Sequence, residues 1–174
     1  MIRHLTQKQQ GQALVFVALV LTFLSMLVLT CIEVAARYQE LAQIEDALKQ
    51  STRSSVQAFD YAAFAQNNQR VREASATTIT GCASLVEGSA RKLACTLFMT
   101  NAAGVSGMQE TPTQTAARIT WTFLPQGGTC SRPPVTFTTP AVCATLQPRM
   151  TGLLGWGIWT PQIDAADTLD HLGN

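Results

Sequence analysis

The stretch that decides the fold runs from Gly11 to Tyr38 and reads GQALVFVALVLTFLSMLVLTCIEVAARY. No charged side chain occurs between Ala13 and Ile32. Because a helix rises about 1.5 Å per residue, this segment is roughly 30 Å long, the thickness of a bilayer hydrocarbon core. We therefore expect a basic leader at residues 1–11 and one transmembrane helix at residues 12–33.

Charges on the two sides of this run indicate its orientation. Arg3 and Lys8 precede it, and the first acid, Glu33, stands at its far edge. The positive-inside rule then predicts a cytoplasmic N-terminus and an extracytoplasmic body. The formal net charge of +1 gives no reason to expect a nucleic-acid partner.

Two other interpretations of the N-terminus remain open. A cleaved secretory signal is disfavoured, since the run is long for an h-region and no A-x-A pattern follows it. A lipoprotein signal is a closer alternative, because Val28-Leu29-Thr30-Cys31 resembles a lipobox. Otherwise Cys31 is a small apolar residue of a membrane helix.

The helical pattern continues past the membrane run. Residues 34–72 contain neither proline nor glycine, so we expect an extracytoplasmic helical rod that extends to about Ala65 and then frays or turns. Its apolar residues recur in steps of mostly three and four, which predicts a packing stripe. The stripe includes Val34, Tyr38, Leu41, Leu48 and Phe59.

Residues 77–174 are expected to form a small β-rich domain. Residues 77–101 suggest two strands and a turn, with a short helix within 83–94 as the alternative. Residues 104–115 suggest a loop. Residues 118–123 alternate strictly, and 135–138 and 141–146 suggest further strands. The expected fold class is α+β: a long membrane-spanning helix that continues into a rod, followed by a small, disulfide-stabilised, antiparallel β-rich head.

The four cysteines beyond the apolar run are expected to form disulfides in an oxidising compartment. Cys82 and Cys95 are thirteen residues apart, as are Cys130 and Cys143. Of the three connectivities, this spacing favours Cys82–Cys95 and Cys130–Cys143. A zinc site is disfavoured, since no C-x-x-C pair occurs.

The C-terminal region holds an apolar cluster among glycines, comprising Leu153, Leu154, Trp156, Ile158 and Trp159. We expect it to pack against the sheet. The alternative is an exposed patch that meets another subunit or the membrane surface. Asp164, Asp167 and Asp170 recur every three residues, which would place them on one helix face, either as a weak cation site or as an ordinary tail.

Chemistry-bearing motifs are absent from the sequence. There is no G-x-S-x-G, H-E-x-x-H, P-loop or G-x-G-x-x-G. The two histidines, His4 and His171, lie at opposite ends of the chain. We expect no enzymatic activity, no catalytic residue, no cofactor and no bound metal.

The N-terminal forty residues resemble the TadE-, TadF- and TadG-like minor pilins of tight-adherence (Flp-type) pilus systems. Gly11 to Val20 is similar to the family pattern G-x-A-L-V-E-F-A-L-V. The acid and base that end the run, Glu33 and Arg37, are also similar to that family. The resemblance implies a non-enzymatic minor pilin, anchored by one span in a bacterial cytoplasmic membrane or incorporated into a pilus. Its implied partners are membrane lipid, other pilin or pseudopilin subunits, the pilus-assembly platform and a prepilin peptidase.

The same resemblance implies a prepilin-peptidase cut between Gly11 and Gln12. Pilin-like substrates usually carry Glu at the fifth mature position, where this chain has Phe16. A carboxylate inside the bilayer is costly and normally functional. Phe16 makes the run an ordinary anchor, so a role in supporting assembly is expected rather than repetition along the shaft. Cleavage of the leader stays open. The alternatives are a single-span surface or adhesion protein unrelated to pili, or a lipoprotein.

Overall fold

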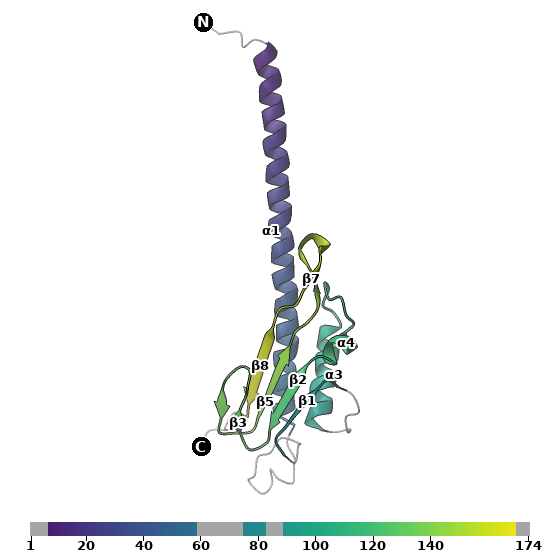
Figure 1. Cartoon of the computed structure of the whole chain (residues 1–174), viewed down its shortest axis with the longest axis vertical. Helices are drawn as coiled ribbons and strands as arrows, with labels where there is room; N and C mark the ends of the chain where they lie inside the picture. The colour runs from purple at the N-terminus through teal and green to yellow at the C-terminus, as the bar shows by residue number, and fades with distance from the viewer. Residues whose placement is uncertain (1–6, 59–74, 83–88, 170–174) are drawn as a thin grey trace. The chain divides into compact units, whose positions relative to one another are not determined.

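The computed structural model describes residues 7–58, 75–82 and 89–169 of the chain, excepting the side chains of residues 7–12 (Figure 1). The chain forms two compact units, Met1–Tyr38 and Gln39–Asn174, named here the N-terminal unit and the head. Helix α1, Gln7–Val56, supplies the first unit and the first element of the second.

Apolar side chains surround α1 on every side in the N-terminal unit. The large apolar residues from Leu14 to Ile32 are between 39% and 73% exposed. The hydroxyls of Thr22, Ser25 and Thr30 each donate to a carbonyl oxygen four residues earlier, at 2.8 Å. The polar groups of this segment are thereby satisfied within the helix, as a lipid environment requires. Within the described residues, α1 is the one helix long and apolar enough to span a membrane.

The head is built on a four-stranded antiparallel sheet in the order β1-β2-β5-β8. These strands are β1 Thr77–Thr80, β2 Thr120–Leu124, β5 Ala141–Leu146 and β8 Ile163–Thr168. Two small hairpins join β3 Gly128–Thr129 to β4 Thr136–Phe137, and β6 Met150–Thr151 to β7 Ile158–Trp159. The remaining elements are α3 Ala90–Ala102, α4 Pro112–Ala116 and a 3-10 turn at Leu153–Gly155.

One face of the sheet forms the main core with the helices. The register places Trp121 opposite Ala144, and Phe123 opposite Val142. Because side chains alternate across a strand, these residues share one face. They belong to the same buried cluster as Ile44, Leu48 and Val56 of α1, and Ala94 and Phe98 of α3.

Small polar residues form the end of α1. Ser51, Thr52 and Ser55 are buried, and their hydroxyls donate to backbone carbonyls of Ala47, Lys49 and Ala90. Helix α1 ends at Val56, short of the expected end near Ala65, and residues 59–65 lie outside the described residues. Serine and threonine side chains compete for backbone groups, and Ala58 N–H closes a tight turn onto the Ser55 carbonyl at 3.1 Å. Phe59 and the rest of the expected rod lie outside the described residues.

The segment expected to supply a second strand forms a helix instead. Residues 93–99 lie in α3, which begins at Ala90 because the Ser89 side chain accepts a hydrogen bond from Lys92 N–H and caps it. The alternative, a short helix within 83–94, overlaps the start of α3 at residues 90–94, and residues 83–88 lie outside the described residues. The buried residues of α3 recur at helical spacing, at Ala90, Ala94, Cys95, Phe98 and Ala102.

Two further expectations are corrected. The loop expected at 104–115 contains the start of α4, which has a capping box between Thr111 and Gln114 and a proline at its first turn. Asp164 and Asp167 lie in strand β8, not in a helix. An odd separation in a strand places their side chains on opposite faces, so they do not form a shared site. Asp170 lies outside the described residues.

The coarse prediction is confirmed: a long apolar N-terminal helix precedes an antiparallel sheet with two disulfides. Strand β2 overlaps the alternating segment 118–123, and β5 coincides with the strand suggested at 141–146. Ile119, Trp121 and Phe123 are fully buried.

Candidate functional site

The predicted processing junction lies within helix α1. Gly11 and Gln12 both have helical backbone. Phe16, at the position where the pilin-like pattern has Glu, is exposed on the apolar segment. No carboxylate therefore occurs in α1 between Gln7 and Ile32.

Glu33 and Arg37 form an ion pair at the end of the apolar run. Arg37 donates to Glu33 Oε1 from Nη2 at 2.7 Å and from Nε at 3.0 Å. The spacing of four residues puts both side chains on one helix face. Pairing lowers the cost of holding these charges next to a hydrocarbon layer.

The predicted packing stripe divides between the two units. Val34 and Tyr38 belong to the N-terminal unit, and Tyr38 is exposed. In the head, Leu48 is fully buried, and Leu41 is half-buried against the same cluster. Ile44, Ala47 and Val56 complete the buried face of this part of α1. From Ile44 onward, this face of α1 therefore contributes to the core of the head.

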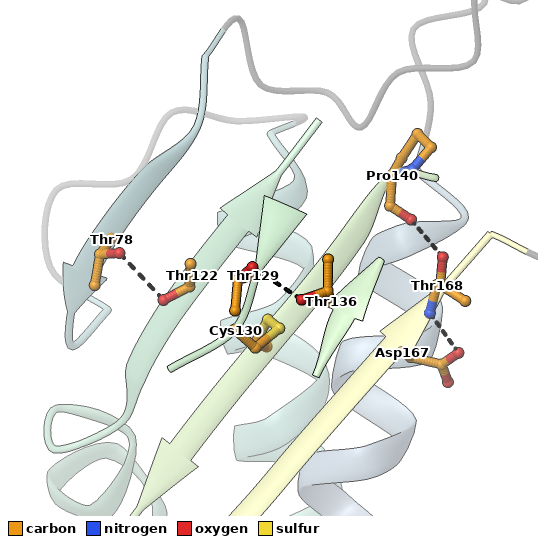
Figure 2. Close-up of a disulfide and its surroundings, with 9 residues drawn as sticks. Thr78, Thr122, Thr129, Cys130, Thr136, Pro140, Asp167 and Thr168 are labelled. Atoms are coloured by element: carbon orange, nitrogen blue, oxygen red, sulfur yellow. Dashed lines mark hydrogen bonds between the residues drawn. A yellow bond between two sulfur atoms is a disulfide. The ribbon is translucent and has the colours of Figure 1, made fainter. Parts of the chain in front are cut away.

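Both predicted disulfides are present. Cys82–Cys95 joins the end of β1 to α3, and Cys130–Cys143 joins the β3–β4 hairpin to β5 (Figure 2). The four thiols are consumed in these bonds, which excludes the alternative zinc site. Cys31 is the free cysteine and is exposed on α1.

The second disulfide covers the other face of the sheet. Cys130 and Cys143 form a small buried cluster with Leu124 and Ala141, and Phe137 and Ala166 pack on it. Threonine pairs reinforce the neighbouring strands: Thr129–Thr136 at 3.0 Å and Thr78–Thr122 at 3.1 Å (Figure 2). The hairpin is thereby fixed over the sheet both by a covalent bond and by apolar burial.

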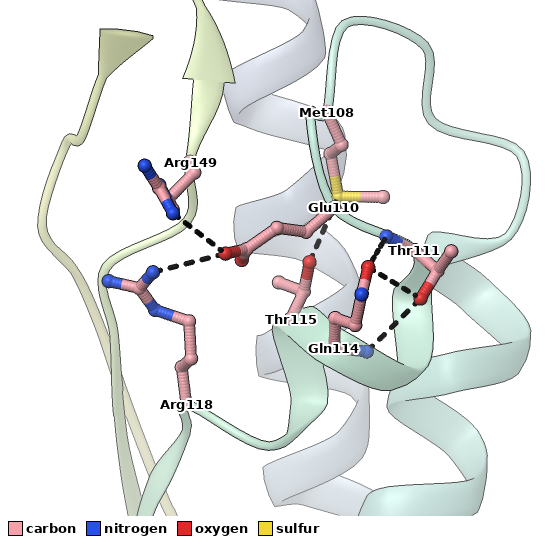
Figure 3. A network of polar contacts seen from close by, with 7 residues as sticks. All are labelled: Met108, Glu110, Thr111, Gln114, Thr115, Arg118 and Arg149. Atoms are coloured by element: carbon pink, nitrogen blue, oxygen red, sulfur yellow. Dashed lines mark hydrogen bonds and ion pairs between the residues drawn. The ribbon is translucent and has the colours of Figure 1, made fainter.

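In the described part of the head, a carboxylate lies between two arginines. Glu110 Oε1 lies 3.2 Å from Arg118 Nη1 and 3.7 Å from Arg149 Nη1 (Figure 3). These residues are far apart in sequence, so helical or strand spacing gave no signal for the cluster. With no nucleophile among its members, the cluster connects the loop before α4 to the segments that lead into β2 and β6.

A shallow groove of about 350 Å³ lies within the head beside α1 and the end of α3. It is lined by Gln43, Asp46, Ala47, Gln50, Asn101, Gly104 and Val105. Asn101 Nδ2 donates to Gln50 Oε1 at 3.0 Å. Asp46 is the single ionisable group in this lining, which is too few for acid–base or metal chemistry. Across the described ranges, no group of three or more His, Cys, Asp or Glu residues converges.

The C-terminal apolar cluster does not pack as expected. Leu153, Leu154, Trp156 and Ile158 are all exposed, and only Trp159 packs at the edge of the core. The reason lies in the turn that carries them. Gly155 and Gly157 have positive φ, and Gly152 lies where a Cβ would come 2.0 Å from the Trp156 carbonyl oxygen. These glycines permit a tight loop between β6 and β7 that presents its side chains outward.

Comparison with known proteins adds no assignment. No protein-family model matches the chain, and no match is found among curated proteins or among solved structures.

Proposed function

We propose that the protein is a non-enzymatic minor pilin or pilus-assembly component of a Tad-type pilus or a related secretion system. It is held by one span in a bacterial cytoplasmic membrane, with the leader inside and the head outside. In this proposal the membrane lipid, other pilin or pseudopilin subunits and the assembly platform are its partners.

The observation that carries the proposal is the double role of α1. Its residues 13–32 are apolar and exposed, whereas Ile44, Leu48 and Val56 lie in the core of the head. The same helix thus supplies both the apolar run and part of the core of the head. The resemblance of Gly11 to Val20 to the minor-pilin pattern gives this anchor its proposed context.

The disulfides support the proposed orientation. Structural disulfides persist outside the reducing cytoplasm. Both lie in the head, at Cys82–Cys95 and Cys130–Cys143, which favours an extracytoplasmic head. The positive charges of the leader, Arg3 and Lys8, favour the same orientation.

A second candidate function is favoured by Phe16. A single-span surface protein unrelated to pili needs an anchor and a head but no carboxylate inside the bilayer. An aromatic residue at this position suits such an anchor.

Mass spectrometry of the N-terminus of membrane-extracted protein tests these assignments, with and without a co-expressed prepilin peptidase. A peptidase-dependent start at Gln12, abolished in Gly11→Leu, is the result expected of a processed minor pilin. A lipid-modified Cys31 at the N-terminus would instead establish a lipoprotein. If the leader stays intact, deletion of the gene tests the role in pili. Loss of pili in the deletion strain would support an uncleaved assembly component, and unchanged piliation would contradict the proposal.

A further inference from the structure

The loop between β6 and β7 presents a compact apolar tip. We name it the apolar loop and define its tip by Leu153, Leu154, Trp156 and Ile158. Trp156 is 81% exposed, the highest value among the exposed large apolar side chains that the structure describes. In the described head the other exposed large apolar residues are Leu93 and Val135, which stand singly. A clustered apolar tip of this kind indicates a contact outside the chain.

The backbone of the tip supports the same conclusion. Leu154 has φ of 54°, in the left-handed region that glycine adopts freely and leucine does not. Holding a non-glycine residue there carries a conformational cost. Its side chain is 56% exposed, so contacts within the head do not compensate that cost fully. A contact of the Leu154 side chain outside the head would compensate this cost.

The charge pattern around the loop narrows the nature of that contact. No Asp, Glu, Lys or Arg occurs from Met150 to Ile163. Tryptophan and leucine without charges are the residues that occupy the boundary between lipid headgroups and acyl chains. A stable protein–protein interface buries about 1,200 Å² or more in total, which a tip of four side chains does not supply alone.

The place of the loop within the head also favours lipid. Ser106 Oγ donates to Glu40 Oε1 at 2.9 Å, and Glu40 is the second residue of the head. The neighbouring Gly107 carbonyl accepts from Thr151 N–H in β6 at 2.8 Å. These two hydrogen bonds connect the base of the hairpin, through residues 106 and 107, to the part of α1 that begins the head. Tethering by α1 gives such a tip a high effective concentration at the bilayer.

We propose that the apolar loop is a second membrane contact, in which Trp156, Leu153 and Leu154 enter the interfacial layer of the bilayer that α1 spans. The proposal rests on the membrane anchor of the proposed function and is independent of any role in pili. It assigns the head a defined contact with lipid in addition to the membrane span of α1.

Tryptophan fluorescence of the full chain in liposomes tests this contact. Ordinary phosphatidylcholine is compared with phosphatidylcholine brominated in the upper acyl chain, which quenches nearby indoles. Trp121 is fully buried in the head and serves as an internal background. We expect brominated lipid to quench the native protein, Trp156→Phe to lose most of that quenching, and the matched control Trp159→Phe to retain it.

A second variant keeps the test valid if Trp156→Phe disturbs the head. Leu154→Gly relieves the left-handed residue and removes one apolar side chain, so the head should keep its thermal stability while quenching of Trp156 falls. Equal Trp156 emission in the two lipids would overturn the proposal. So would cysteine crosslinking that places the tip against a second copy. If the chain does not bind liposomes, the membrane anchor itself is refuted. This outcome distinguishes failure of the proposed function from failure of the loop contact.

Discussion

The hydroxyl of Ser55, in the last turn of α1, donates a hydrogen bond to the carbonyl oxygen of Ala90, the first residue of α3, at 3.0 Å. Both residues are completely buried. A side chain larger than serine would push the two helices apart at this point. The bond thus fixes how the last turn of α1 meets the start of α3.

Loss of this bond should destabilise the head. Ser55→Ala removes the donor but leaves little empty space, so we expect a loss of about 1 kcal/mol in the free energy of unfolding. Ser54→Ala, at a half-buried neighbour, is the matched control, with an expected change within about 0.5 kcal/mol. Urea unfolding of the head in lipid nanodiscs measures both, and equal effects would contradict the assigned role of Ser55.

Truncation of Leu48 should have the larger effect. Its side chain is fully buried in the main core, so Leu48→Ala should cost about 2–5 kcal/mol through lost burial and a cavity. The exposed Leu93 of α3 provides the control, since Leu93→Ala should change stability by at most about 0.5 kcal/mol. Leu48→Asp should lower the abundance of the protein in the membrane. An unchanged abundance would mean that α1 is only a spacer.

The disulfides predict a simple labelling pattern. Alkylation of denatured, unreduced protein should modify Cys31 and none of the four head cysteines, whereas reduction should expose all five to the reagent. Each disulfide closes a loop over a sequence separation of thirteen residues. Replacing Cys130 and Cys143 together by alanine should lower stability by about 3 kcal/mol, the chain-entropy value for a loop of about 15 residues. Labelling of all four without reduction would refute the bonds.

Two glycines offer a matched pair for the apolar loop. A Cβ at Gly152 would meet the Trp156 carbonyl oxygen at 2.0 Å, whereas nothing lies within 4 Å of a Cβ at Gly104. Gly152→Ala should therefore force the loop open and shift the amide NMR signals of residues 151–159. Gly104→Ala should leave them unchanged. If Gly152→Ala left the amide signals of residues 151–159 unchanged, the loop would not adopt this turn.

The Glu110 cluster should show measurable coupling. Glu110→Gln removes the charge that faces Arg118 and Arg149. Because Arg118 is partly exposed, we expect a coupling energy of only about 0.5–1 kcal/mol in a double-mutant cycle of Glu110→Gln with Arg118→Ala. Additive effects of the two substitutions would mean that the ion pair contributes nothing to stability.

Sequence patterns were sufficient where one local signal dominates. The uncharged run before Glu33 predicted the apolar part of α1, and strict alternation predicted the buried Trp121 and Phe123 of β2. Equal spacing of the cysteines predicted both pairs. In the first two cases neighbours along the chain determine the outcome, and for the cysteines the equal spacing was sufficient.

The errors arose where contacts distant in sequence decide. Residues 93–99 contain residues found in strands and helices alike, and the cap at Ser89 together with packing of Phe98 selected a helix. The Glu110 cluster joins residues from separate segments. The apolar loop was assigned to the core because hydrophobicity alone does not distinguish burial by the same chain from burial by a partner.

The disulfides also set how far the head can lengthen under tension. Residues inside a closed loop do not extend while the bond is intact. With a separation of thirteen residues and about 3.5 Å of reach per residue, each bond withholds about 45 Å of contour length. Under the same force, the unfolded head would therefore be shorter with its disulfides intact than with its cysteines reduced. It would also have a smaller distance to contract when it refolds.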